Sequence, residues 1–264
     1  MKIGFIGAGN MAGALAFGAW KSGLAKADEL YISAKTREHL GKFEDAGMHV
    51  GTDNAFVTEH ADVVVLAVKP NVFPEILGHP AFQKRNTLFI SVAAGISIQK
   101  IKELLGFDAK IVRAMPNTPA KVGEGMSVLS YCEPCREEDY KIAETLFSSV
   151  GKVQLIAEAK MNEIIAVTGS SPAYVYYFID RIAKKAEEYG FSYQDGTKLA
   201  AQAVLGSAKM VLEEEEGPDV LKARVCSKGG TTLAALEKLE DGRFSDAISE
   251  AMDACVKRAY ELGK

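Results

Sequence analysis

Glycines close to the start of the chain have the spacing that can hold a phosphate group. Residues 1–13 read MKIGFIGAGNMAG, a short apolar segment followed by Gly7, Gly9 and a helix-forming run. The first glycine of such a segment lets the chain turn sharply off a strand, and the second lets backbone N–H groups approach a pyrophosphate at the helix N-terminus. The segment therefore predicts a dinucleotide-binding turn. Its cofactor-binding residues are Ile6, Gly7, Ala8, Gly9, Asn10 and Met11.

The end of the second predicted strand decides which dinucleotide this turn binds. In sheets that bind NAD, an Asp or Glu about 20 residues after the turn binds the ribose 2′-hydroxyl. Here residues 32–37 read ISAKTR, with hydroxyls and two cations but no carboxylate. This composition suits the 2′-phosphate of NADP, although Lys35 and Arg37 are also compatible with a solvated first helical turn. We expect NADP as the cofactor, with NAD used at lower efficiency. The expected contacts are Ser33, Lys35, Thr36 and Arg37.

Two further strand ends carry small residues that suit a flat cofactor ring. The third predicted strand closes with Ala67-Val68-Lys69-Pro70, and the fourth with Ala93-Ala94-Gly95. Ligands of open α/β sheets bind at the carboxyl ends of the strands, so both segments are candidate cofactor contacts. Small residues at strand ends also occur without a ligand.

Strand-like and helix-like segments alternate in the first part of the chain. We expect strands at Lys2–Ile6, Glu29–Ala34, Val63–Val68, Thr87–Ala93, Lys110–Met115, Met126–Tyr131 and Val153–Ile156. We expect helices at Met11–Ser22, Arg37–Ala46, Pro74–Leu77, Ile98–Leu105 and Glu137–Ser149. This alternation predicts a parallel sheet in a doubly wound Rossmann-type domain over residues 1–159.

The pattern changes after about residue 159, where apolar residues recur at helical spacing. Three long helical segments are expected, at Lys160–Glu188, Tyr193–Glu214 and Thr231–Leu262. They predict a smaller all-helical domain over residues 160–264. Apolar positions are too numerous for three helices to bury alone, which predicts a protein partner.

Charge and apolar runs exclude several classes of partner. The chain of 264 residues has a formal net charge of −4, so its overall charge does not indicate nucleic acid or an anionic membrane as a partner. Its longest purely apolar run, Val63–Val68, is far shorter than the about 20 residues that span a bilayer. An apolar run also follows Lys2, but its glycines argue against a signal peptide. We expect a small-molecule substrate, with no nucleic acid and no membrane.

The cysteines are too sparse for a disulfide framework, which predicts a cytoplasmic protein. They are Cys132, Cys135, Cys226 and Cys255. The Cys132-Glu133-Pro134-Cys135 segment leaves a metal or redox site as an alternative. Zinc needs about four ligands, and all four histidines lie in the first third of the chain, so we expect no metal.

Six segments together resemble the pyrroline-5-carboxylate reductase family over essentially the whole chain. They are GFIGAGNMAGAL at 4–15, LAVKPN at 66–71, VAAGIS at 92–97, RAMPNTPA at 113–120, GSSPAY at 169–174 and VCSKGGTTLAAL at 225–236. Many families share the glycine turn, whereas SKGGTT at a helix start combined with MPNTP is specific. Lys228 departs from the pattern, because many members carry proline there.

This resemblance implies the NAD(P)H-dependent reduction of 1-pyrroline-5-carboxylate to L-proline, the final step of proline biosynthesis. It also implies that the helical domain binds substrate and dimerises, as a homodimer or a ring of dimers. Asn54 and Asn117 join the cofactor site on the same basis. The implied substrate-binding residues are Val225, Ser227, Gly229, Gly230, Thr231 and Thr232.

The residue types of the last segment support this chemistry. N–H groups at a helix start that follows Gly229-Gly230 can hold a carboxylate without an arginine. The Thr232 hydroxyl, which we take as catalytic, can hydrogen-bond the ring nitrogen or relay a proton to it. The alternative is that Gly-Gly-Thr is only a helix-capping turn.

Other functions remain open at this point. One is another NADP-dependent imine or 3-hydroxyacid reductase, and another is a non-catalytic NADP-binding protein. Ketone reduction is disfavoured because the second half lacks histidine and GSSPAYVYYF at 169–178 lacks lysine. Two further segments each have two interpretations. One carboxylate of Glu213–Glu216 contacts the substrate, or these residues form a solvated helix end. The side chains of Tyr174, Tyr176 and Tyr177 line a pocket, or they belong to the core and the subunit interface.

Overall fold

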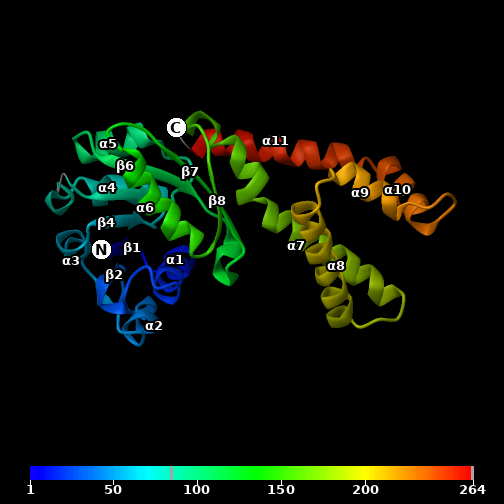
Figure 1. Ribbon diagram of the computed structural model, residues 1–264, viewed down its shortest axis with the longest axis horizontal. Helices are drawn as coiled ribbons and strands as arrows, with labels where there is room; N and C mark the ends of the chain where they lie inside the picture. Colours follow the sequence, from blue (N-terminus) through cyan, green and yellow to red (C-terminus); the bar gives the residue numbers. More distant parts are fainter. Residues whose placement is uncertain (84–85, 263–264) are drawn as a thin grey trace. The chain divides into compact units, whose positions relative to one another are not determined.

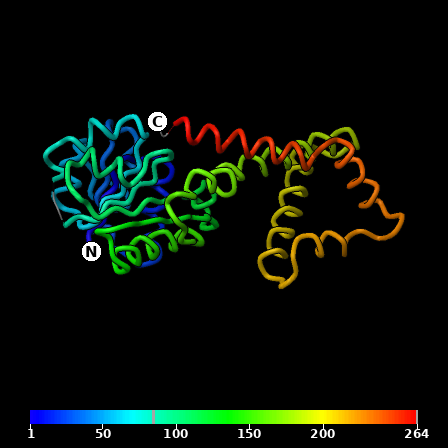
Figure 2. The backbone as a smooth tube through the Cα atoms, turned by 90° about the horizontal axis from the view of Figure 1, so that it is seen from above, coloured from blue at the N-terminus to red at the C-terminus, as the bar shows by residue number. Residues whose placement is uncertain are grey.

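The computed structural model describes residues 1–83 and 86–262. Its contacts divide the chain into two compact units, one containing the sheet and one composed of helices (Figures 1 and 2). The first, which we name the nucleotide unit, comprises Met1–Ser170 and the C-terminal segment from Cys255. The second, the helical unit, comprises Ser171–Ala254. Residues 160–170 thus lie in the nucleotide unit, and the boundary expected after residue 159 stays a prediction.

The nucleotide unit is built on one eight-stranded sheet within the described residues, with the order β3-β2-β1-β4-β5-β6-β7-β8. The strands are β1 (Ile3–Ile6), β2 (Leu30–Ser33), β3 (His49–Gly51), β4 (Val63–Leu66), β5 (Leu88–Ser91), β6 (Lys110–Met115), β7 (Gly125–Tyr131) and β8 (Gly151–Leu155). The order reverses between β1 and β4, which is the switch point where such sheets bind ligands. The predicted α/β class with a doubly wound domain is confirmed.

Helices cover both faces of the sheet, because apolar residues alternate along the strands. Ile3 and Phe5 pack in one core cluster with α1 (Asn10–Lys21), α2 (Gly41–Glu44) and α6 (Glu137–Ser148). Ile6 packs in the other with α3 (Asn54–His60), α4 (Phe73–Leu77) and α5 (Ile98–Leu105). The two-residue period of a strand sends successive side chains to opposite faces. This arrangement fixes the strand ends that carry the glycine turn.

Two features of the sheet differ from the expectation. β6 and β7 pair antiparallel, not parallel. Residues 116–124 connect them, and a parallel connection needs about a dozen residues or more. β3 was not predicted, since three residues beginning with a histidine give no apolar period. β3 nevertheless pairs in parallel with β2 and extends that edge of the sheet.

The helical unit contains α7 (Ser171–Glu188), α8 (Tyr193–Glu213), α9 (Pro218–Val225), α10 (Thr231–Asp241) and the first part of α11 (Phe244–Leu262). The 3₁₀ turn η6 (Glu158–Lys160) and the π-helical turn η7 (Ile165–Gly169) precede α7, so the helix expected from residue 160 begins later. α9 was not expected, because Gly217-Pro218 indicated a break. Proline at the first helical position instead begins a helix.

The single helix expected over 231–262 is two helices, because Arg243 has a left-handed φ of 57° between α10 and α11. The helical unit has almost no core of its own, since its fully enclosed residues are Ala183, Gly196 and Ala200. Among the described residues, no helix is both long and apolar enough to cross a membrane.

Candidate dinucleotide and substrate sites

The glycine turn joins the ends of three strands. Gly7 has a φ of 109°, and a Cβ added to it would lie 2.6 Å from the carbonyl oxygen of Ala67. Only glycine therefore fits this position. The Gly7 N–H donates to the Ser33 carbonyl at 2.9 Å, and the Ala67 N–H donates to the Ile6 carbonyl at 2.9 Å. The turn is held by backbone hydrogen bonds to β2 and β4.

The N-terminus of α1 opens beside this turn. Gly9 caps the helix in an extended conformation without a side-chain hydrogen bond, and the first turn holds no acidic residue. A Cβ added to Gly9 would meet no atom within 4 Å, so the space before the helix is open. The N–H groups of a first helical turn lack partners inside the helix. Such a terminus can bind the pyrophosphate of a dinucleotide.

A pocket of about 400 Å³ adjoins the helix start, and sequence reasoning missed part of its lining. It is lined by Ala8, Gly9, Asn10, Glu38, His39, Gly41 and Lys42. His39 and Lys42 add groups that can bind a phosphate, whereas Glu38 would repel one. The signal that could have found them is their position in the turn and helix that directly follow Arg37.

The end of β2 carries one buried and three exposed candidates. Ser33 is buried, and its hydroxyl donates to Oδ1 of Asn54 at 2.7 Å. Ser33 therefore orients the Asn54 amide at the start of α3. Lys35, Thr36 and Arg37 are exposed, and the Arg37 guanidinium lies 3.8 Å from the Glu44 carboxylate, which is also exposed. Because the Arg37–Glu44 pair is exposed, the cations of Lys35 and Arg37 both remain accessible to a ligand.

The ends of β4 and β5 lie at the same sheet edge as the glycine turn, because β1, β4 and β5 are parallel neighbours. Ala67 and Val68 are half-buried there, Lys69 is exposed, and Pro70 begins a short 3₁₀ turn. After β5, Ala93 is buried, Ala94 is half-buried, and Gly95 has a φ of 79°. Most candidate cofactor contacts therefore gather on one edge.

Asn117, after β6, holds two other segments. Its amide nitrogen donates to the Thr168 carbonyl at 3.1 Å, and its amide oxygen accepts from the Met126 N–H at 2.9 Å. Both polar groups of the side chain are thus engaged with the protein. Its assignment to the cofactor site stays a prediction.

Arg113, in the same strand, was not singled out from the sequence. It is 4% exposed, and its guanidinium donates to Glu158 at 3.2 Å and to Asn162 at 3.3 Å. Oε1 of Glu158 also accepts the Ile98 N–H at 2.7 Å. Arg113 in β6 therefore holds Glu158 and Asn162, and Glu158 in turn holds the start of α5, which follows the Ala93–Gly95 segment.

The expected substrate residues lie at the end of α9, in the loop that follows it and in the first turn of α10. Gly229 has a φ of 72°, and Gly230 caps α10, with its N–H donating to the Ser227 carbonyl at 2.9 Å. A Cβ on Gly230 would collide with the Ser227 hydroxyl oxygen. The cap has no side-chain hydrogen bond and the first turn holds no acidic residue, so the α10 N-terminus can accept an anion.

The other members of this loop differ in exposure. Val225 is 68% exposed at the end of α9, Thr231 is exposed, and Thr232 is half-buried at the second helical position. Glu216 pairs with Arg224 of α9, whereas Glu213, Glu214 and Glu215 are exposed. Among the four residues Glu213–Glu216, the carboxylate of Glu216 is therefore already paired with a cation.

Cys132 and Cys135 flank the segment for which a metal or redox site was the alternative. Within the described ranges, no group of three or more His, Cys, Asp or Glu residues could hold a metal ion. Cys132 is exposed and Cys135 is buried, and both are free thiols. Burial raises the pKa of Cys135 to about 12, which keeps this thiol protonated and poorly reactive.

Two family models match the chain. The model described as pyrroline-5-carboxylate reductase dimerisation matches residues 158–262. The model described as NADP oxidoreductase coenzyme F420-dependent matches residues 2–95. The two matches correspond to the helical part and to the glycine-turn part of the chain.

Relatives and solved structures agree with these matches along the full length. The pyrroline-5-carboxylate reductase of Escherichia coli is 38% identical, over 100% of this chain and 98% of its own. The Coxiella burnetii pyrroline-5-carboxylate reductase structure has a TM-score of 0.91 at 35% identity, covering 100% of this chain and 98% of its own. The Plasmodium falciparum pyrroline carboxylate reductase structure, with NADP bound, has a TM-score of 0.91 at 30% identity and the same coverage. This chain belongs to the pyrroline-5-carboxylate reductase family.

Proposed function

We propose that this chain reduces 1-pyrroline-5-carboxylate to L-proline with NADPH. The observation that carries the proposal is the Gly229–Gly230 turn, which leaves the N-terminus of α10 open to an anion and places the Thr232 hydroxyl in the first turn of the same helix. A cyclic imine that carries a carboxylate offers matching groups, one anionic and one a hydrogen-bonding nitrogen. Membership of the family supports the same reaction.

The cofactor half of the proposal rests on the nucleotide unit. The open α1 N-terminus suits the pyrophosphate, and the small residues after β4 and β5 suit the nicotinamide. Lys35 and Arg37 are exposed where a carboxylate would otherwise select NAD, which supports a preference for NADP. NAD is the less efficient cofactor in this proposal.

The chemistry needs little from the protein beyond binding and one hydrogen bond. NADPH, when bound, supplies a hydride to the imine carbon. The α10 N-terminus holds the substrate carboxylate, and the Thr232 hydroxyl donates a hydrogen bond to the ring nitrogen or relays a proton to it. An imine nitrogen is basic enough to carry its own proton, so a hydroxyl can replace a stronger acid. The four histidines all lie at or before residue 79, so the α10 segment that holds the substrate contains no histidine that could act as the acid.

The proposed active form is a homodimer or a ring of dimers. Large apolar side chains of the helical unit are exposed in the single chain, including Tyr177, Leu199 and Leu212. A second copy that covers them would supply the missing core. The match to a dimerisation model over residues 158–262 supports this assembly.

A spectrophotometric assay tests the reaction. The purified protein should lower the absorbance of NADPH when 1-pyrroline-5-carboxylate is added, and L-proline should accumulate in equal amount. Turnover of 3-hydroxy acids without turnover of the imine would assign the chain to a different reductase activity. Binding of NADPH without any turnover would leave a non-catalytic binding protein.

A further inference from the structure

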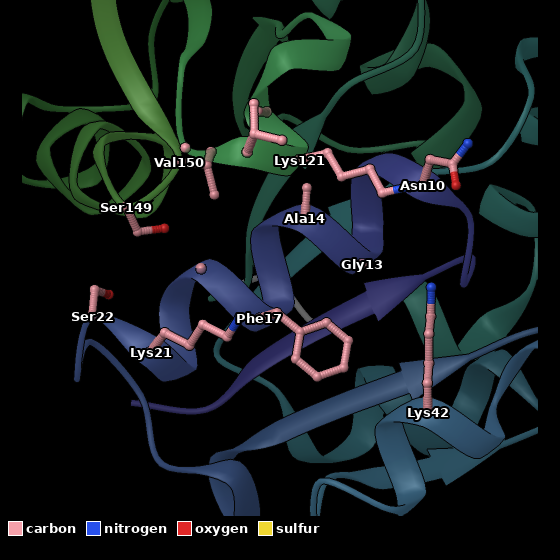
Figure 3. A pocket seen from close by; sticks show the side chains of 14 residues that line it. Asn10, Gly13, Ala14, Phe17, Lys21, Ser22, Lys42, Lys121, Ser149 and Val150 are labelled. Atoms are coloured by element: carbon pink, nitrogen blue, oxygen red, sulfur yellow. The ribbon is translucent and has the colours of Figure 1, made fainter. Parts of the chain in front are cut away.

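A groove runs along the exposed side of α1 in the nucleotide unit (Figure 3). Its volume is about 840 Å³, which is the size of a small-molecule site. Three elements beside α1 contribute to its lining: α2 through Lys42, the 3₁₀ turn η5 (Thr118–Val122) through Lys121 and Val122, and the end of α6 with the residues after it through Ser149 and Val150.

The groove is positively charged in a chain that is acidic overall. Lys21, Lys42 and Lys121 line it, and the lining contains no carboxylate. Within residues 1–83 and 86–262, none of these three lysines has an ion-pair partner. The Lys42 ammonium lies over the Phe43 ring, 4.8 Å from its centroid. No carboxylate of the described residues pairs with the three lysines, so they favour an anion with several negative groups.

An apolar surface lies between these cations. The Phe17 ring lines the groove and stacks on Phe43, with ring centroids 5.4 Å apart and an angle of 13° between the planes. Val122 also lines the groove and is 76% exposed. A ring supported in this way offers a flat platform to a ligand that has an aromatic part.

The groove is distinct from the dinucleotide pocket along most of its length. The two share Asn10 and Lys42. Lys21 lies at the other end of α1, eleven residues further on, which corresponds to about 16 Å along the helix axis. A dinucleotide bound at Gly9 therefore leaves the Lys21 end of the groove free.

We propose that this groove is a second nucleotide site, which binds a nucleoside polyphosphate beside the bound dinucleotide. Lys21 at one end of the groove and Lys121, which points toward Asn10 at the other end (Figure 3), pair with different phosphates of the chain, and Phe17 supports the base. The shared residues Asn10 and Lys42 couple the two sites, so that occupation of the groove alters the affinity for NADPH.

Titration of the full-length protein with ATP, in the presence of saturating NADPH, tests this proposal. Calorimetry should detect saturable binding while the dinucleotide site is filled. The variant Lys21→Gln/Lys121→Gln should weaken ATP binding at least about tenfold, because two charge-assisted contacts are lost. The variant Lys26→Gln/Lys141→Gln removes the same charge from exposed lysines outside the groove and should bind ATP as the wild type does.

Four outcomes would overturn the proposal. They are the absence of saturable binding up to about 10 mM ATP, loss of ATP binding once NADPH is bound, equal weakening by the two double variants, and equal affinity for ATP and inorganic tripolyphosphate. Equal affinity for ATP and tripolyphosphate would show that the base adds nothing to binding and therefore does not pack on Phe17. Retained NADPH binding by Lys21→Gln/Lys121→Gln shows that the variant is folded.

Discussion

The Thr232 hydroxyl lies on a helix whose first turn has free N–H groups, so its proposed role can be separated from theirs. Thr232→Ala should lower kcat/KM for the imine about 10- to 1,000-fold, the range of a lost hydrogen bond or of modest acid catalysis. Thr232→Ser should keep most of the activity, because the hydroxyl remains. NADPH affinity should stay unchanged in both, which fluorescence titration measures. Equal turnover of Thr232→Ala and wild type between about pH 6 and 9 would reduce Thr232 to a helix residue without a chemical role.

Lys35 and Arg37 carry the predicted preference for NADPH. The double variant Lys35→Ala/Arg37→Ala should lower kcat/KM for NADPH by about 10- to 100-fold, since charge-assisted contacts to a 2′-phosphate are lost. The value for NADH should change little, because that cofactor lacks the phosphate. Steady-state kinetics with each cofactor measure the ratio. A wild-type preference for NADH would contradict the assignment.

Ser33 illustrates what the sequence leaves open at a single position. Its place at the end of β2 was predictable, and it was expected to contact the cofactor beside Lys35. The structure buries its hydroxyl against the Asn54 amide, twenty-one residues further along the chain, and the contact with the cofactor stays a prediction. Which face of a strand end meets the core depends on the partners that cover it. A single sequence does not give those partners.

At the scale of elements, β6 anchors the segment that leads to the helical unit. Arg113 of β6 forms an ion pair with Glu158 in this segment. Breaking a buried ion pair by removing one partner costs about 3–5 kcal/mol, and the 29% exposure of the Glu158 side chain favours the lower end of that range. Arg113→Met should therefore lower the free energy of unfolding by about 3 kcal/mol. Urea denaturation at one fixed protomer concentration measures this loss.

The double variant Arg113→Met/Glu158→Gln provides the control for this pair. Replacing both charges should cost less than the sum of the two single losses, because the uncompensated carboxylate is gone. Additive losses, or an effect of Arg113→Met below about 1 kcal/mol, would show that the pair contributes little to the anchor.

The predictability of the elements follows the range of their interactions. β1, β4, β5 and the glycine turn could be predicted because their apolar runs and glycines are local signals. β3, the antiparallel turn into β7 and the π-helical turn before α7 have no local period. The Arg113–Glu158 pair joins residues 45 apart in sequence, and neither side chain carries a motif of its own. The α10 turn was predictable only because its residues match a family pattern.

At the scale of the whole molecule, the helical unit needs a partner to bury its surface. Leu205 and Leu212 are 49% and 83% exposed, and they lie seven residues apart on one face of α8. Leu205→Glu/Leu212→Glu should yield monomers, because burying each unpaired carboxylate at an interface costs several kcal/mol. The monomers should still bind NADPH through the nucleotide unit but fail to reduce the imine, since the α10 turn belongs to the unit that loses its partner. Light scattering, NADPH titration and the absorbance assay measure the three properties.

Gln202→Glu adds a negative charge at a polar position of the same helix and should remain oligomeric and active. A variant that is monomeric by light scattering and reduces the imine normally would show that the active site is complete within one chain, while leaving the proposed reaction intact.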